Sequence, residues 1–447
     1  MNPTTTALRD LALLPCDPGY DAAATPWNLA VRQRPAAVAV PRTIDEVVDL
    51  VRAATGLGLR IAPQSTGHGA AAVAGLDDAV LLRLHELTGV AVDPIARRAR
   101  VIGGTLWRDV LAATAPHGLT ALHGSAGDVA VAGYLLGGGL SFYGREHGLA
   151  SSAVRAIDLV TADGSLVRAS AEEHPDLFWA VRGGGGSFGV VVAIELDLLP
   201  LADVVAGMLL WDIERAPEVL SAWRDWTATL PESVTTSVRL MRFPPLPELP
   251  PFLSGRSLVV IDGAVLEDDD RAAELLAPLR ALAPELDTFG RIPAAALLDV
   301  HMDPPGPTPA VSDHALLTHL PQEAVEALLA VAGPGVQTPL MFAELRHLGG
   351  ALARPQDAAL SHLAGAYALF AVSPAPTQEL AALGETVTTG VVAALRPWAA
   401  ETSFLNFADR VIDPATAFDA TAWQRLQHIR DTYDPAQTWV AAHAVGQ

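Results

Sequence analysis

The chain has 447 residues, half of them hydrophobic and 18% charged, which is enough for a large core divided among two or three folding units. Its 29 basic and 50 acidic residues give a net charge of -21, which disfavours nucleic acid and anionic membranes as partners. Every basic residue is arginine, which excludes a lysine Schiff base and the lysine-containing phosphate loop of NTPases.

Cysteine and histidine usage narrows the chemistry further. Cys16 is the only cysteine, so an internal disulfide and a thiolate metal cluster are excluded. His301, His314 and His319 are not accompanied by carboxylates or cysteines at a recognised ligand spacing, and no metal site is predicted. The segment Met1–Tyr20 lacks the basic and apolar regions of a signal peptide, and no run of 18 apolar residues occurs, so we expect a cytoplasmic protein.

The first 200 residues alternate short strands and helices. Thr43-Ile-Asp-Glu46 is a capping box and predicts a helix from Ile44 towards Gly56. Ile157–Arg168 contains an Asp-Gly turn and predicts a hairpin. Periodicity and glycine breaks predict further strands at Leu59–Pro63, Val80–Leu84, Ala96–Ile102 and Phe188–Leu196, and helices at Leu106–Ala115 and His174–Arg182.

The texture of the sequence changes after about Leu201. Pro-rich loops occur at 243–251 and 303–309, and Ala/Leu-rich helices alternate with strands. We therefore place a boundary near residue 200 and expect the second unit to end near Ala400. The last segment, 401–447, is expected to return to the first unit.

Three Gly-rich loops lie in the first unit. Glycine lets backbone N–H groups approach a phosphate without any basic side chain, which suits an acidic chain that binds a polyphosphate cofactor. The alternative is that these glycines only form tight turns. Gly137-Gly-Gly139 lacks the preceding strand and the following acidic residue of a Rossmann fingerprint, so a conventional dinucleotide fold is not indicated.

A series of motifs runs in order along residues 20–200. The motifs are Trp27-Asn28, Arg34–Val38, Pro41–Val47, Thr66–Gly69, Gly124-Ser125, Val131–Gly139, Arg145–Leu149, Val160–Gly164, Asp176–Gly186 and Phe188-Gly189. Together they resemble the FAD-linked oxidases of the vanillyl-alcohol-oxidase superfamily, in the berberine-bridge-enzyme-like branch. The resemblance implies an α+β fold, with a two-subdomain FAD-binding domain at 1–200, an inserted α+β substrate-binding domain at 201–400 and a C-terminal segment at 401–447 completing the FAD domain.

The resemblance also implies cofactor contacts. His68 would be joined through its ring to the 8α-methyl group of FAD. The pyrophosphate would be wrapped by backbone N–H groups of Gln64, Ser65, Thr66, Gly67 and Gly69. The opposite wall would be formed by Ser125, Asp128, Gly133 and Gly138. Val192 would lie near the nucleotide half of the cofactor, and the amide of Asn406 would bond the pyrimidine edge of the flavin.

Two departures from the family pattern affect the attachment. Some relatives attach FAD twice, through this histidine and a cysteine in the second loop. Here Ala126 or its neighbours occupy that position, so the resemblance implies covalent FAD through His68 only. The attachment loop also has Gly69 where serine is usual after the histidine, which removes one hydroxyl donor.

Phe342–Ala351 resembles a strand and turn of the family's substrate domain. On a strand Phe342, Glu344 and Arg346 share one face, so Glu344 could take a proton from the substrate and Arg346 could fix an anionic or carbonyl oxygen. The alternative is an ion pair between Glu344 and Arg346 on the surface.

Phe404–Phe407 with Asp409 resembles the family's strand that returns beside the flavin. Many relatives carry a tyrosine there, sometimes as the base, whereas phenylalanine cannot accept a proton. Tyr134 and Tyr143 are the tyrosines near the flavin loops, either at the substrate side, where Tyr143 is a catalytic candidate, or packed in the core.

The predicted activity is that of an FAD-dependent oxidase. It would transfer a hydride from a small organic substrate, a secondary metabolite or a sugar or alcohol, to flavin N5, and dioxygen would reoxidise the flavin to give hydrogen peroxide. Three alternatives remain at this point: a flavin dehydrogenase that uses another electron acceptor, a flavin-binding protein that has lost catalysis, and an unusual use of the flavin such as oxygen insertion.

Overall fold

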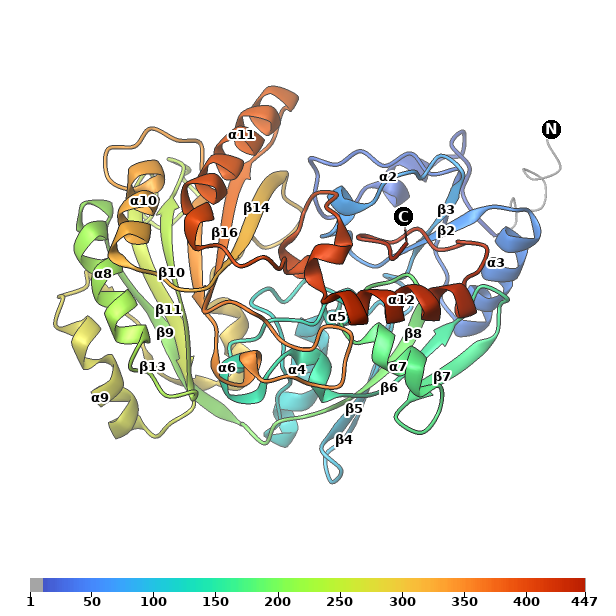
Figure 1. Cartoon of the computed structure of the whole chain (residues 1–447), viewed down its shortest axis with the longest axis horizontal. Helices are drawn as coiled ribbons and strands as arrows, with labels where there is room; N and C mark the ends of the chain where they lie inside the picture. Colours follow the sequence, from blue (N-terminus) through green and yellow to red (C-terminus); the bar gives the residue numbers. More distant parts are fainter. Residues whose placement is uncertain (1–10, 447) are drawn as a thin grey trace.

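Three β-sheets organise residues 11–446, the part of the chain that this computed structural model describes. Residue 447 and the first half of the segment Met1–Tyr20 lie outside the described residues. Figure 1 places the two smaller sheets on one side of the molecule and the largest sheet on the other. The predicted mixture of helix and sheet is confirmed.

The first sheet is parallel and small. Its strands run in the order β1 (Ala37–Ala39), β3 (Ala79–Arg83), β2 (Arg60–Gln64). The C-terminal segment adds to its free edge, because Ile61 exchanges backbone hydrogen bonds of 2.8 Å with Thr438 and Val440. β2 leads directly into the loop at residues 64–70, so the end of the chain lies beside that loop.

Helix α3 (Ile44–Gly56) begins where the capping box predicts. The Thr43 hydroxyl accepts a hydrogen bond from the backbone N–H of Glu46, and the Glu46 carboxylate accepts one from the backbone N–H of Arg42. Two N–H groups that the first turn leaves without helical partners are thereby satisfied. The apolar stripe that includes Val47 and Val51 is buried against the first sheet.

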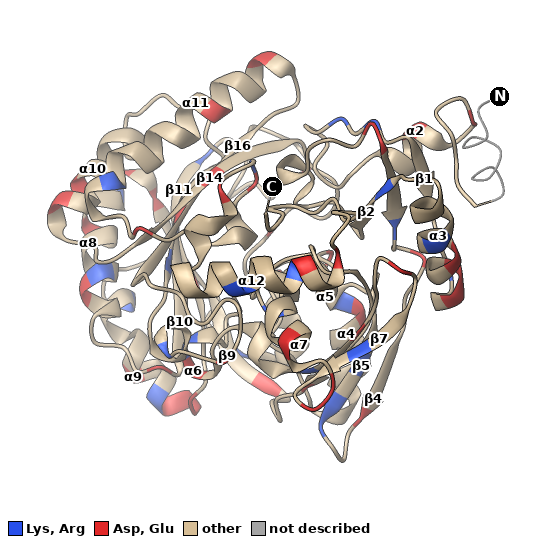
Figure 2. Cartoon of the chain, turned by 45° about the vertical axis from the view of Figure 1, so that its right-hand side comes forward, with Lys and Arg blue, Asp and Glu red and all other residues tan. Residues whose placement is uncertain are grey.

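The second sheet is antiparallel and has one charged face. Its order is β4 (Val90–Asp93), β5 (Arg98–Ile102), β8 (Val190–Asp197), β6 (Val154–Val160), β7 (Leu166–Ser170). The predicted hairpin is β6–β7, and Gly164 adopts a φ of 77° in its turn. Figure 2 shows arginine positions on β5 and β7. Ion pairs across this sheet join four arginines to three carboxylates: Arg98, Arg100, Arg155 and Arg168 to Asp158, Glu195 and Asp197.

Helices pack around these two sheets. They are α2 (Tyr20–Ala24), α4 (Trp107–Thr114), α5 (Val131–Leu136), α6 (Gly144–His147), α7 (Pro175–Val181) and α12 (Ala420–Tyr433). Within residues 11–446 no helix combines the length and apolar character needed to cross a bilayer.

The largest sheet has eight strands. They are β9 (Asp203–Asp212), β10 (Val234–Arg242), β11 (Ser257–Val265), β12 (Leu286–Asp287), β13 (Gly290–Pro293), β14 (Ala310–Leu317), β15 (Phe342–His347) and β16 (Tyr367–Pro374). The order is β12-β9-β11-β10-β15-β16-β14, and β13 also pairs with β9. All neighbours are antiparallel, and β15 lies between β10 and β16.

Four helices cover one face of the large sheet (Figure 1): α8 (Ala216–Thr227), α9 (Asp269–Arg280), α10 (Gln322–Ala332) and α11 (Gln378–Leu395). Because side chains alternate along a strand, Trp211 and Leu345 face these helices, whereas Leu210 and Phe342 face the opposite way. This second, inner face of the sheet therefore faces the rest of the chain.

Two sequence-based expectations are wrong in detail. The predicted Gly-rich loop at Gly133–Gly139 begins later than expected. Gly133 lies within α5, which ends at Leu136, and only Gly137–Gly139 form the loop. The predicted returning strand at Phe404–Asp409 is instead a short 3₁₀ helix, η8 (Leu405–Phe407), followed by a loop.

The cap of α3 gives a test of the local energetics. Thr43→Ala should lower the free energy of unfolding by about 1 kcal/mol, because the N–H of Glu46 loses its acceptor. Thr43→Ser keeps the oxygen and should cost only a few tenths of a kcal/mol. Urea denaturation of the three proteins measures both differences, and equal losses in the two variants would contradict the capping role.

Candidate functional site

A cavity of about 470 Å³ lies where the loop after β2, the segment around α5 and the inner face of the large sheet meet. Glycines, small apolar residues and aromatic rings form most of its wall. The ionisable side chains that line it are His68, Tyr134, Asp303, Arg346, Asp409 and His443. A mostly apolar cavity with a few convergent polar groups is the usual form of a small-molecule site.

Most of the residues predicted to contact a cofactor line this cavity. They are Gln64, Ser65, Thr66, Gly67, His68, Gly69, Ser125, Gly133 and Asn406. The other three, Asp128, Gly138 and Val192, are not in the lining, but each is next in sequence to a residue that is. The structure therefore gathers residues from four separate segments of the sequence around one space.

His68 is held in place by two neighbours. Its ring stacks on Trp27 with the ring centroids 4.1 Å apart, and its Nδ1 shares a 2.7 Å hydrogen bond with the Thr66 hydroxyl. Asp128 accepts a 2.7 Å hydrogen bond from Nε1 of Trp27, and its Oδ1 lies 3.8 Å from Nε2 of His68. That last distance is too long for a hydrogen bond.

The free nitrogen of His68 is buried and chemically available. Burial lowers the pKa of His68 to about 4, although the charges of Asp128 and Asp303 oppose this shift. The ring is therefore neutral at physiological pH. Its Nε2 is buried and has no hydrogen-bond partner among residues 11–446. An unpartnered buried nitrogen is costly unless another group uses it.

Glycine is required on two sides of the cavity. Gly67 adopts a φ of 89°, and a Cβ there would lie 2.7 Å from both Pro26 and Gln64. A Cβ on Gly137 would lie 2.5 Å from Oδ1 of Asn406. Side chains at these positions would displace the walls that the loops form.

Two predicted contact residues already have protein partners. The Asn406 amide accepts a 3.1 Å hydrogen bond from the N–H of Gly139 and donates one of 3.3 Å to the carbonyl of Tyr134. The Ser125 hydroxyl donates a 2.7 Å hydrogen bond to Asp303. Asn406 thus fixes the glycine turn after α5, and Ser125 ties the second loop to the segment that follows β13.

Arg346 enters the cavity from β15 with a buried charge network behind it. Its Nε donates a 2.9 Å hydrogen bond to Glu344, and its Nη2 lies 3.0 Å from Nε2 of His301. Nδ1 of His301 donates a 2.8 Å hydrogen bond to Asp262. Glu344 is 0% exposed, so the alternative of a surface ion pair is wrong.

The register of the sheet assembles this network. Arg239 on β10 lies directly opposite Glu344 on β15, and Ser237 lies opposite Asp262 on β11. Arg239 and Ser237 donate hydrogen bonds of 2.6 and 2.5 Å to the two oxygens of Asp262. Asp262 is therefore a fully buried carboxylate with three donors, which is how a buried charge is tolerated.

The predicted role of Glu344 as a base does not fit this placement. Glu344 does not line the cavity. Burial is the largest single influence and raises the pKa of Glu344, but the charges of Arg346, His301 and Arg239 and a hydrogen bond with His301 together hold the pKa well below the usual carboxyl range. Such a carboxylate binds protons weakly, and its geometry suits the orientation of Arg346.

The two tyrosines have different positions. Tyr143 is 0% exposed, packs edge-to-face against His123 and does not line the cavity, so a catalytic role does not fit. Tyr134 lines the cavity, but its hydroxyl is buried without a partner among the described residues. Burial raises the pKa of both tyrosines, so neither hydroxyl is an accessible base.

Sequence reasoning assigned no role to three cavity residues. Asp303, Asp409 and His443 come from loops that have no recognisable motif. Asp409 follows Phe407 by two residues, but no local pattern gave it a role. Across residues 11–446 no group of three or more His, Cys, Asp or Glu side chains is arranged to hold a metal ion.

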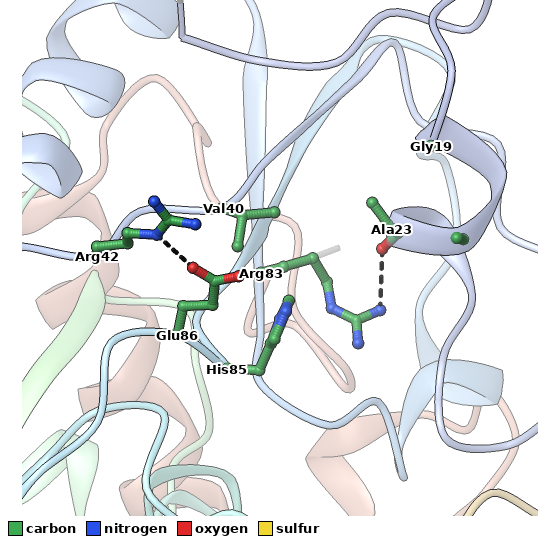
Figure 3. A pocket seen from close by; sticks show the side chains of 8 residues that line it. Gly19, Ala23, Val40, Arg42, Arg83, His85 and Glu86 are labelled. Carbon is green, nitrogen blue, oxygen red and sulfur yellow. Dashed lines mark hydrogen bonds and ion pairs between the residues drawn. The ribbon is translucent and has the colours of Figure 1, made fainter.

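A second pocket, of about 420 Å³, lies beside the end of β3 (Figure 3). Arg83 and His85 line it, whereas Leu84 between them lines the main cavity. Its charges are already used: Arg42 pairs with Glu86 at 2.5 Å, and Arg83 donates to the carbonyls of Ala23 and Thr25 at the end of α2. These contacts give the charged residues of the second pocket a structural role, so the main cavity is the candidate functional site.

Comparison with known proteins identifies the N-terminal part. Residues 35–170 match the family described as FAD binding domain. The chain is 35% identical over 209 residues to (R)-6-hydroxynicotine oxidase of Paenarthrobacter nicotinovorans, an alignment that covers 46% of each protein. The chain spans about half the length of the curated relatives that it matches.

Solved structures share the whole fold. Physcomitrella patens BBE-like 1 superposes with a TM-score of 0.85 at 20% identity, covering 99% of this chain and 98% of the other. Glucooligosaccharide oxidase from Acremonium strictum, whose FAD is described as 6-S-cysteinyl, 8α-N1-histidyl, gives 0.83 at 21% identity and covers 99% of both chains. At these identities the likeness establishes the fold.

The ion network predicts that loss of the buried carboxylate of Glu344 lowers the free energy of unfolding more than loss of an exposed carboxylate. Glu344→Gln should lower the free energy of unfolding by about 3 kcal/mol, because Arg346 keeps a buried charge without its counter-ion. Glu232→Gln, which removes the exposed partner of Arg354, should cost less than about 1 kcal/mol. Denaturant unfolding compares them, and similar costs would contradict the burial of the Glu344 charge.

Proposed function

We propose that this chain is an FAD-dependent oxidase of a small organic substrate and a member of the vanillyl-alcohol-oxidase superfamily of FAD-linked oxidoreductases. The observation that carries the proposal is the unpartnered, desolvated Nε2 of His68. It lies in a glycine-walled cavity that also receives the guanidinium of Arg346. Groups suited to a cofactor and to a substrate therefore face one space.

The residues of the cavity fit FAD. The ring nitrogen of His68 that has no partner is the atom through which a flavin would be attached, and the neutral ring is the form that can make such a bond. Backbone N–H groups of Gln64–Gly69 would hold the diphosphate opposite Gly133, as glycine-rich turns do without basic side chains. This suits a chain with a net charge of -21.

We propose that the covalent link is single. Ala126 lines the cavity in the second loop, where a doubly attached relative would need a thiol. Cys16 is exposed, is not in the lining, and hydrogen bonds Asp17 next to it. Two histidines line the cavity, His68 and His443, and His68 is the one in the loop that resembles the attachment loop of the family.

Bound FAD supplies a two-electron acceptor that takes a hydride from the substrate and passes the electrons to dioxygen. Arg346 would hold a substrate oxygen, because its guanidinium is oriented by Glu344 and faces the cavity. The rings of Phe370 and Phe407, 4.9 Å apart at their centroids, would cover apolar parts of the substrate and exclude water. A secondary metabolite or a sugar or alcohol fits this combination.

We further propose how the chain is divided. Residues up to 200 form the FAD-binding domain, 201–400 form the substrate-binding domain, and 401–447 complete the first. The connection between β8 and β9 at about residue 200 and the hydrogen bonds of Ile61 to the C-terminal segment support this division.

We also propose that the protein acts in the cytoplasm, because a single exposed cysteine suits a reducing compartment.

Attachment of the flavin can be tested by acid precipitation. Protein purified with FAD should keep its yellow colour in the pellet, whereas His68→Ala should release the colour to the supernatant, because the variant lacks the proposed attachment atom. Cys16→Ser is the matched control and should behave like the wild type. Colour that stays with the His68→Ala pellet would contradict the assignment.

The reaction can be tested with the substrates that the names of the relatives indicate, (R)-6-hydroxynicotine and gluco-oligosaccharides. A substrate should bleach the flavin anaerobically and yield hydrogen peroxide under air. Arg346→Gln should lower kcat/KM by about 10²-fold, because a charge-assisted hydrogen bond to the substrate is lost. Bleaching without peroxide would contradict the oxidase proposal and assign a different electron acceptor.

A further inference from the structure

We propose that Asp409 is the general base that takes the proton from the substrate's hydroxyl or amine group as the hydride leaves. The inference rests on the proposed oxidase function and adds the residue that function needs. Phe404 and Phe407, the aromatic residues that precede Asp409, accept no proton. Asp409 follows two residues after Phe407 and lines the same cavity.

The side chain of Asp409 is fixed at one oxygen. Ser312 on β14 donates a 2.5 Å hydrogen bond to Oδ2. Among the residues described, Oδ1 has no hydrogen-bond partner, and it is not sealed off from solvent. Asp409 keeps partial exposure because it lines the cavity. One oxygen is therefore anchored, and the other remains free to accept a proton.

The arginine and the two histidines near Asp409 are engaged elsewhere. Arg410, the next residue, pairs with Asp313 at 2.8 Å. His443 hydrogen bonds the carbonyl of Ala408 at 2.9 Å, and His314 receives the backbone N–H of Phe404. Within residues 11–446 no arginine or histidine nitrogen lies within 4.0 Å of the Asp409 carboxylate. No counter-ion thus holds the carboxylate in its charged form.

Burial raises the pKa of Asp409 to about 6, against the hydrogen bond from Ser312. A base whose pKa lies near the working pH accepts a proton readily and still releases it. Glu344 contrasts with it, because its pKa lies well below the usual range and it does not line the cavity. Of these two carboxylates, only Asp409 combines access with basicity.

The proposed step is balanced in protons and electrons. The substrate loses a hydride, which carries two electrons from its C–H bond to the flavin. It also loses the proton of its O–H or N–H group to Asp409, and a C=O or C=N double bond forms. Dioxygen then takes up the two electrons and two protons, one of them from the Asp409 carboxyl, and leaves as hydrogen peroxide.

The test measures anaerobic flavin reduction in the holoenzyme as a function of pH, with a substrate identified from the panel above. In the wild type the rate should rise through about pH 6 and then level off, because only the deprotonated carboxylate accepts the proton. Asp409→Asn should lower the rate at least about 10²-fold and abolish this limb. Asp409→Glu should recover part of the rate.

Two further variants separate a base from a structural residue. Ser312→Ala removes the hydrogen bond that lowers the pKa, so the rising limb should move to higher pH while the plateau rate is kept. Asp413→Asn is the matched control, since Asp413 is exposed in the same segment outside the cavity lining, and it should change neither limb nor plateau. A limb that is unchanged in Asp409→Asn would overturn the inference.

An infrared titration of the holoenzyme needs no substrate. A protonated carboxyl band should grow as the pH falls through about 6 and should be missing in Asp409→Asn. Its absence in the wild type would overturn the base inference alone. Failure of every substrate to reduce the wild-type flavin would overturn the proposed function, and with it the step assigned to Asp409.

Discussion

The burial of one imidazole ring, that of His68, is the constraint on which the rest of the cavity depends. His68 is stacked on Trp27 and bonded by Thr66, so its ring has a fixed orientation, and burial keeps it neutral. A ring nitrogen left without a partner in such a place costs free energy unless a ligand bonds to it. The glycine turns and the C-terminal segment around it also leave room for a ligand, because they line the cavity without filling it.

The opposite side of the cavity poses a different electrostatic problem. Arg346 brings a full positive charge to an apolar space, and a buried charge requires counter-charges close by. The antiparallel register of β10, β11 and β15 supplies them, because it aligns Glu344, Arg239 and Asp262 on the inner face of the sheet. The network therefore fixes the direction of the Arg346 guanidinium, and it explains why Glu344 is inaccessible.

Local signals in the sequence were sufficient for much of the fold. The capping box at Thr43, the Asp-Gly turn at Gly164 and the alternation in Phe188–Leu196 each depend on residues close in sequence, and α3, β6–β7 and β8 form where they predict. The motif around His68 likewise predicted a loop that lines the cavity. In contrast, the expected strand at Phe404–Asp409 is a 3₁₀ turn, because no neighbouring strand pairs with it there.

The site chemistry depended on contacts that no local pattern contains. Asp262 is brought near Glu344 by the pairing of β10 with β11 and β15, and His301 joins them from the loop before β14, so the burial of Glu344 could not be predicted. Burial in the folded chain raises the pKa of Asp409, and the hydrogen bond from Ser312 on another element opposes that shift. Tyr143 seemed a candidate by proximity in sequence to the flavin loops, but its side chain points into the core.

The most direct measurement is the mass of one peptide. Cleavage after arginine releases Ile61–Arg83, which contains His68 as its only histidine. In protein purified with its flavin, this account predicts that the peptide carries the added mass of FAD and that the modification maps to the His68 ring. An unmodified peptide, with all of the FAD recovered free in solution, would contradict the covalent role of that nitrogen.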